Sequence, residues 1–528
     1  MNRPSMFVAV LLACLTSACG SSTPPLEYPP QPGLGEGEQA APVAEQREPL
    51  PDAPRLVVRP SQSPIVTIRV VFDAGSSEDP AGREGITDLA MRLMAEGGAG
   101  ELSYTELTER LFPMAAGIGF SVDRDQSVLV GRVHRDHLAD FYAIFRDVLL
   151  RPRMSEEDFT RVKSQAVNAL TLELRGNDDE ELGKEMLQAM LYASQPYGHP
   201  ALGTETGLAR ITLDDVRAHR SRVLCGGRAT VGVAGALPEG FAERVRTDVA
   251  SLTSSACVGR LVLPAVPDVG APRIWIVDKP EADSVAISMG MPVDAVRGSA
   301  DYAALTLAAA YLGQHRQFAG RLMQKMRGDR GLNYGDYAYA EHFEQDGWSR
   351  YPDPNIARRQ QYFSIWIRPV EPQNAQFALR MAIRELRGIV DHGMTQEDFE
   401  RVRAFIDSYY ALFLQTESRR LGYAIDDAFY GQQQAWIDSL RAAWRALTVE
   451  QVNAAIRTHW RPAALQVAIV APHAAELAAA IAADGPSPIQ YPAEKPPEIL
   501  AEDREIQAYH VAIPRDRIRI VPLAQTFH

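Results

Sequence analysis

Apolar and polar residues alternate along the chain with two different periods, which predict strands and helices. Segments with a period of two, typical of strands, lie at 65–72, 127–133, 229–234, 274–277, 361–367 and 465–470. Segments with apolar residues three or four apart, typical of amphipathic helices, lie at 138–150 and 374–390. This mixture predicts an α+β fold, in which antiparallel-leaning mixed sheets carry helices on one face.

Two segments of the first half recur in the second half. Residues 154–163 match 394–403, and residues 211–216 match 447–452, at spacings of 240 and 236 residues. The second residue of each copy of the first segment, Ser155 or Thr395, is suited to be a helix N-cap and is followed by acidic residues that favour the first turn. Two matches at nearly the same spacing predict two tandem homologous domains.

Changes in composition along the chain predict where these domains begin and end. We expect an N-terminal domain at 55–250 and a C-terminal domain at 273–480. The segment 251–272 is rich in Pro, Gly and Ser and is predicted to link them. Residues 481–528 form a tail that ends in an alternating run, for which we expect an edge strand. Residues 337–359 are interpreted as an insertion that contains aromatic residues and Pro.

Composition excludes several classes of protein. The 528 residues include 54 basic and 67 acidic side chains, which leaves a net charge of −13. Hydrophobic residues make up 46 %, enough for large cores. No basic block is present, which argues against nucleic acid as a partner. The four Cys are too few for a scaffold held together by disulfides.

The first residues are typical of a bacterial secretory signal. Arg3 precedes an apolar run at 6–15, and the residues that follow resemble a lipobox ending in Cys19. We therefore expect a lipoprotein signal peptide at 1–18 and lipidation of Cys19; an ordinary cleaved signal or an uncleaved anchor are the alternatives. The Pro- and Gly-rich segment 19–54 is predicted to be a disordered tether.

The expected signal has consequences for location and for the remaining thiols. Gly20 after the lipidated Cys resembles the signal for the outer membrane, so we expect a periplasmic body attached to the membrane only through its lipid. In an oxidising compartment Cys225 and Cys257 could pair, although two buried free thiols remain an alternative.

Residues 75–94 resemble the start of the insulinase/pitrilysin family of zinc peptidases. In that family a helix carries His-x-x-Glu-His, whose two His bind zinc and whose Glu is the general base. This chain has Asp88, Met91 and Arg92 at those positions, and Leu170 aligns with the downstream Glu ligand. Because Met91 is no general base and Arg92 repels a cation, we expect no metal at this site.

A second motif resembles the family's C-terminal half. Arg327 is followed by Gly331-Leu332 and, seven residues after the arginine, by Tyr334. The resemblance implies that this pair reaches the zinc site of a partner half and contacts the substrate. A phenol O–H can donate to a developing oxyanion, and a guanidinium can hold a peptide carbonyl group.

Together the motifs favour a subunit of a peptidase that binds no cofactor itself. We expect it to pair with a homologous subunit that carries the zinc, and to complete the active site in which that subunit hydrolyses peptides. One alternative is a peptide-binding or scaffolding protein that retains only the fold. The other is a self-sufficient zinc metalloendopeptidase, which needs another metal site. Only His134, Asp136 and His137 have suggestive spacing, and we interpret them as solvated turn residues.

Overall fold

The computed structural model describes residues 45–266, 268–344 and 349–528. The expected signal peptide and Cys19 lie outside these residues. Residues 45–54 of the expected tether are described, and they differ from the prediction of disorder because they pack on the body: Arg47 pairs with Leu261 in a β-bridge and lies 2.5 Å from the Glu78 carboxylate. In the described part of the chain, every helix is too short or too polar to span a membrane.

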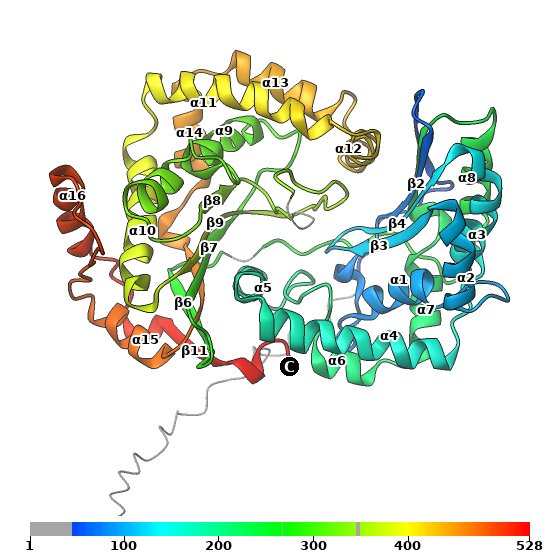
Figure 1. Ribbon diagram of the computed structural model, residues 1–528, viewed down its shortest axis with the longest axis horizontal. Helices are drawn as coiled ribbons and strands as arrows, with labels where there is room; N and C mark the ends of the chain where they lie inside the picture. The colour runs from blue at the N-terminus through cyan, green and yellow to red at the C-terminus, as the bar shows by residue number, and fades with distance from the viewer. Residues whose placement is uncertain (1–44, 267, 345–348) are drawn as a thin grey trace, which may run out of the picture.

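The first half is built around a sheet with the strand order β1-β5-β2-β4-β3 (Figure 1). Only β1 and β5 run parallel, and the other neighbours are antiparallel. Its strands are β1 (Arg55–Pro60), β2 (Ile65–Phe72), β3 (Gly117–Val122), β4 (Ser127–His134) and β5 (Ala229–Gly235). Its helices are α1 (Ile86–Glu96), α2 (Tyr104–Leu111), α3 (Leu138–Leu150), α4 (Glu156–Asn168), α5 (Asp179–Leu191), α6 (Glu205–Arg210), α7 (Leu213–Val223) and α8 (Phe241–Ala250).

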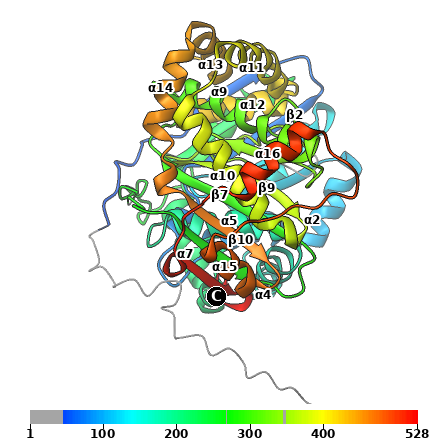
Figure 2. The ribbon, with the colours of Figure 1, turned by 90° about the vertical axis from the view of Figure 1, so that its left-hand side faces the viewer.

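The second half has a sheet with the order β11-β6-β10-β7-β9-β8. Its strands are β6 (Arg273–Asp278), β7 (Val285–Val293), β8 (Asp336–Tyr339), β9 (Gln361–Val370), β10 (Gln466–Ala471) and β11 (Ile518–Pro522). Its helices are α9 (Tyr302–Gly313), α10 (Ala375–His392), α11 (Gln396–Tyr409), α12 (Glu417–Phe429), α13 (Trp436–Ala446), α14 (Val449–His459), α15 (Ala474–Ala483) and α16 (Pro497–Gln507). The tail supplies β11 as the expected edge strand, parallel to β6, and α16 packs on α10 (Figure 2).

The two halves repeat one topology. Read in chain order, β1 to β5 occupy the same places in the first sheet as β6 to β10 in the second, which confirms the two-domain α+β prediction. The repeated helix starts are also alike: the hydroxyls of Ser155 and Thr395 each accept a hydrogen bond of 3.1 Å from the backbone N–H three residues later. Thr212 and Thr448 begin the other repeated helix pair, each with a capping box.

The halves exchange equivalent helices, which local patterns did not predict. Helix α5 of the first half packs on β7 and β10, whereas α12 of the second half packs on β5 and β1 (Figure 1). At Gly232 in β5, a Cβ atom would lie 2.5 Å from Cδ1 of Ile425 in α12, so a larger residue here would force the α12 side chains to shift. Each sheet is therefore also covered on the face opposite its own helices, and the halves form one body.

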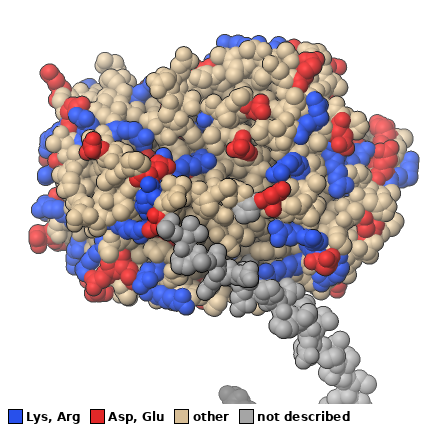
Figure 3. Space-filling model, turned by 180° about the vertical axis from the view of Figure 1, so that it is seen from behind, with Lys and Arg blue, Asp and Glu red and all other residues tan. Residues whose placement is uncertain are grey.

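Polar pairs and the last residues of the sequence also join the halves. Arg358 and Arg359, which precede β9, form ion pairs with Asp123 and Asp125 in the turn between β3 and β4. Phe527 belongs to the hydrophobic core of the first half, although it follows β11 of the second sheet. On the face shown in Figure 3, acidic and basic side chains are interspersed.

Candidate functional site

Helix α1 carries the three positions of the expected zinc motif, and their side chains are engaged with one another or with the core. Met91 is fully buried. Arg92 Nε lies 3.2 Å from Asp88 Oδ2, one helical turn away, and the guanidinium carbon of Arg92 lies 5.1 Å from the centre of the Phe120 ring. Burial raises the pKa of Asp88, and the charge of Arg92 opposes that shift.

The fourth position is equally unsuited to a metal. Leu170 lies in the π-helical segment Ala169–Asn177 and is buried in the same hydrophobic core as Met91. A thioether, a guanidinium and an aliphatic side chain do not provide the imidazole and carboxylate donors that zinc takes in peptidases. The residues present do not fit a zinc ion at α1.

Arg327 and Tyr334 lie side by side on the second half. Arg327 Nη1 donates a hydrogen bond of 3.0 Å to the carbonyl oxygen of Tyr334, and its guanidinium carbon lies 5.7 Å from the centre of the Tyr334 ring. The guanidinium carbon of Arg327 also lies 4.7 Å from the centre of the Phe318 ring. Tyr334 is 78 % exposed and Phe318 is 61 % exposed. Sequence reasoning missed Phe318, since nothing in its local pattern distinguishes it from a surface residue.

Arg327 lies in the π-helical segment Met323–Asp329, and the turn that connects it to Tyr334 is supported by the tail. Gly331 has a φ of +69°, a conformation suited to glycine, and its N–H donates to the Arg327 carbonyl oxygen at 2.9 Å. The adjacent Arg330 is buried and forms ion pairs of 2.9 and 2.8 Å with Glu502 and Asp503 of α16. The arrangement presents Arg327 and Tyr334 to solvent on a fixed backbone.

Asp336 lies beneath the same turn and is fully buried. Its Oδ1 accepts a hydrogen bond of 2.7 Å from Asn333, whereas Oδ2 has no hydrogen-bond partner. Burial raises the pKa of Asp336 to about 8, although the hydrogen bond from Asn333 and the charge of Arg368 oppose the shift.

Asp336→Asn is expected to flatten the pH dependence of stability. Because the folded-state pKa of Asp336 lies near 8 and the unfolded one near about 4, the contribution of Asp336 to the stability of the wild type is largest below pH ~4. It should then lose up to about 1.4 kcal/mol per pH unit as the pH rises towards 8. Urea unfolding at several pH values measures this slope. Parallel curves for the two proteins would contradict the assignment; the exposed Asp214→Asn is the control.

A polar cleft of about 520 Å³ opens between the two halves. The start of α5 forms one wall, and the second sheet with the loop after β8 forms the other. Lys184 Nζ lies 3.8 Å from the centre of the Trp366 ring and 2.9 Å from the Glu181 carboxylate. Residues that line the cleft from both halves include Asp178, Glu181, Lys184, Glu344, Trp366 and Arg368.

The other candidates from the sequence lie apart from this cleft. His134 and Asp136 form an ion-pair contact of 3.4 Å in an exposed turn, where His137 is also exposed. Cys225 and Cys257 are joined by a disulfide. Met91 and Leu170 belong to the core of the first half, whereas Met326 and Leu332, which flank the Arg327 turn, belong to that of the second. The two sets of predicted site residues therefore lie on different halves of the chain.

The repeated fold and the altered motif define a peptidase-like protein without the zinc donors of a catalytic helix. Two sequence models agree with this: "Insulinase (Peptidase family M16)" matches residues 55–205, and "Peptidase M16 inactive domain" matches residues 210–406. The chain belongs to the insulinase (M16) peptidase family.

Relatives of this chain include proteins named as zinc proteases and a protein named as a non-peptidase. The chain is 21 % identical over 440 residues to the non-peptidase homolog YmxG of Helicobacter pylori, covering 83 % of this chain and 96 % of that protein. It is 22 % identical over 456 residues to an uncharacterized zinc protease of Mycobacterium tuberculosis, covering 84 % and 96 %. The crystal structure of a peptidase M16 inactive domain from Pseudomonas fluorescens has the same fold, with a TM-score of 0.69 at 20 % identity over 81 % of this chain and 98 % of that one.

Proposed function

We propose that this chain is a subunit of a peptidase complex, in which it supplies Arg327 and Tyr334 to the active site of a homologous partner that carries the zinc. One observation supports the proposal above all: the chain presents this pair to solvent on a fixed turn while its own α1 has no donor set for zinc. A scaffold alone has no need of both residues at this spacing.

The two side chains have complementary roles in this proposal. The exposed phenol O–H of Tyr334 donates to the substrate carbonyl oxygen as negative charge develops on it. The Arg327 guanidinium, which lies near the Phe318 and Tyr334 rings, offers the N–H groups that are not bonded to the Tyr334 carbonyl oxygen to a second peptide carbonyl. The substrate is accordingly a peptide bound through its backbone.

The proposal includes a location in the cell envelope. A lipid on Cys19 would hold the body at the outer membrane, on its periplasmic side, and residues 19–44 would provide the spacing. The disulfide between Cys225 and Cys257 is consistent with an oxidising compartment.

Reconstitution of the complex tests the proposal. The purified chain, alone and mixed with a homologous subunit that has an intact His-x-x-Glu-His motif, is assayed for binding by size-exclusion chromatography and for cleavage of a mixture of unfolded peptides. We expect no cleavage by either subunit alone and cleavage by the mixture. A partner whose motif Glu is changed to Gln is the inactive control. Cleavage by this chain alone would contradict the proposal, and a mixture that binds peptides without cleaving them would favour the scaffolding function.

A further inference from the structure

We propose that Asp123, His342 and Glu344 form a binding site for a divalent zinc-type cation that joins the two halves of the chain. The residues come from both halves: Asp123 lies in the turn between β3 and β4, and His342 and Glu344 lie in the loop that follows β8. This site is separate from the altered motif on α1, and the inference does not depend on the proposed function.

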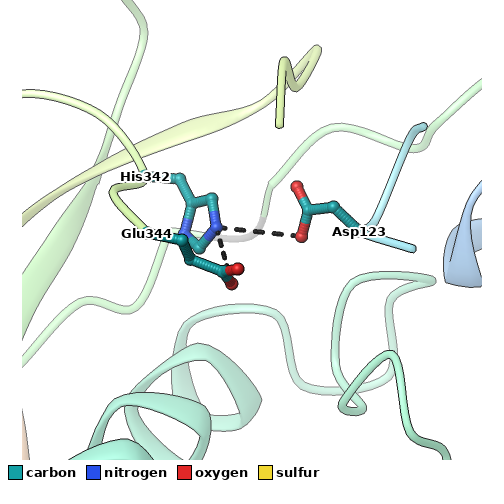
Figure 4. Close-up of side chains that lie close together, drawn as sticks. All are labelled: Asp123, His342 and Glu344. Carbon is teal, nitrogen blue, oxygen red and sulfur yellow. Dashed lines mark hydrogen bonds and ion pairs between the residues drawn. The ribbon is translucent and has the colours of Figure 1, made fainter. Parts of the chain in front are cut away.

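The three ligand atoms already converge on one point. His342 Nε2 lies 3.1 Å from Glu344 Oε1 and 3.7 Å from Asp123 Oδ1, and all three atoms lie within 4.8 Å of one another (Figure 4). Zinc bonds of about 2.0–2.2 Å in a tetrahedral arrangement separate ligand atoms by roughly 3.3 Å. A cation between these atoms therefore needs only a small closure of the Asp123 and Glu344 carboxylates.

The imidazole is oriented for this role. His342 Nδ1 lies 3.2 Å from the hydroxyl of Tyr362, a buried residue of β9. An Nδ1–H that donates to this hydroxyl leaves the lone pair on Nε2, facing the two carboxylates. Histidines that bind metals are commonly held in the right tautomer by such a hydrogen bond on the other nitrogen. In the metal-free protein the opposite tautomer can instead donate from Nε2 to Glu344, so cation and proton compete for one position.

Both carboxylates are held in the ionised form. Burial opposes ionisation of Asp123, but the charge and the hydrogen bonds of Arg358, joined by the charge of His342 when that ring is protonated, keep the pKa of Asp123 well below its usual range. Burial also opposes ionisation of Glu344, and its hydrogen bond with His342 lowers the pKa nonetheless. Two carboxylates and one neutral imidazole offer a mixed oxygen and nitrogen donor set, which suits zinc better than calcium or magnesium.

Arg358 limits how many lone pairs Asp123 can offer to a cation. Its Nε and Nη2 donate hydrogen bonds of 2.7 and 2.5 Å to the two oxygens of Asp123. A carboxylate has about four lone-pair sites, so this pairing leaves one on Oδ1 for the cation. The positive charge of Arg358 weakens the attraction for a cation, so the two carboxylates must outweigh it.

The remaining coordination position has room for water. Glu344 lines the 520 Å³ cleft between the halves, so a cation bound to it would be reached from solvent through that cleft. A bound cation would tie the loop after β8 to the first half and thereby stabilise the contact between the two halves. Its effect is therefore expected on zinc content and on thermal unfolding of the chain.

Metal loading of the purified chain tests the site. The protein is stripped with EDTA, dialysed against ZnCl₂ and then against buffer, and its zinc is measured by atomic emission; calcium and magnesium are tested in parallel. We expect about one zinc per chain, a higher melting temperature with zinc and no effect of calcium or magnesium. His342→Ala should abolish binding, and Glu344→Gln, which keeps the size of the side chain, should weaken zinc binding at least tenfold.

His137→Ala is the matched control, because His137 is exposed and lies outside the cluster. It should bind zinc as the wild type does. Circular dichroism of each metal-free variant verifies that it is folded, and Glu344→Gln serves as the decisive variant if His342→Ala does not fold. A wild type that retains no zinc would overturn the proposal, as would zinc retained undiminished by Glu344→Gln.

Discussion

Tyr334→Phe is expected to lower kcat of the reconstituted peptidase by about 100- to 1000-fold. The substitution removes only the phenol O–H, and the loss of one donor to a developing oxyanion costs about 2.7–4 kcal/mol of transition-state stabilisation. Because the Tyr334 side chain is 78 % exposed, its loss should leave the stability of the chain unchanged. Steady-state kinetics on one peptide substrate, with KM and kcat measured separately, gives the effect.

The control for this variant is Tyr104→Phe. Tyr104 is a partly exposed tyrosine at the start of α2, in the first half, and its replacement should leave kcat unchanged. An unaltered kcat for Tyr334→Phe would mean that the phenol does not contact the reacting carbonyl. A KM effect alone would instead place Tyr334 in substrate binding, where it acts equally on the bound substrate and on the transition state.

Arg358→Met is expected to lower the free energy of unfolding by about 3–5 kcal/mol. Arg358 is fully buried, donates to both oxygens of Asp123 and gives a further hydrogen bond of 2.6 Å to Gln188. Removal of one partner from a buried ion pair leaves the other charge uncompensated, which has a cost of this size. Urea unfolding of the metal-free chain at pH 7 measures it.

Two further variants distinguish the loss of stability caused by breaking the buried ion pair from any general effect of replacing an arginine. Arg246→Met removes a solvent-exposed pair with Glu243 and should change stability by less than about 0.5 kcal/mol. The double variant Asp123→Asn/Arg358→Met should be more stable than Arg358→Met, because no unpaired charge is left. A double variant that is less stable than the single one would contradict the account.

The pH dependence of the wild type's stability should also reflect the ion pair between Asp123 and Arg358. Because the folded-state pKa of Asp123 is held below its unfolded value, the pair contributes its full stability above pH ~4 and loses it as the pH falls. Arg358→Met should be less sensitive to acid than the wild type in that range.

Much of the fold could be predicted from local pattern. The strand expected at 65–72 is β2 within the same bounds, and the helix expected at 374–390 is α10 within two residues at each end. These segments succeed because the period of their apolar residues and their caps are properties of neighbouring residues. The altered positions of the zinc motif were equally local, since spacing along one helix decides which side chains share a face.

The contacts between the halves could not be predicted in this way. Asp123 and Arg358 are separated by 235 residues, and Arg55 in β1 reaches the carbonyl oxygen of Ala428 in α12. The prediction that 337–359 is an insertion is wrong at its start, because 337–339 belong to β8, the counterpart of β3. Farther along this segment, His342 and Arg358 contact the first half. Any residue with a suitable charge could have been their partner, so the sequence contains no local signal for the pairing.

Local sequence was enough to predict a duplicated α+β protein that resembles a family of zinc peptidases but has other side chains at the zinc-binding positions. Repeats, periodicity and motif spacing are properties of the linear sequence, so they can be recognised without knowing which distant residues are in contact. Three features became visible only in the folded chain: the exchange of α5 and α12, the support of the turn after Arg327 by the tail, and the meeting of Asp123 with His342 and Glu344. These arrangements depend on the packing of segments far apart along the chain, where burial and charge compensation select one partner among many.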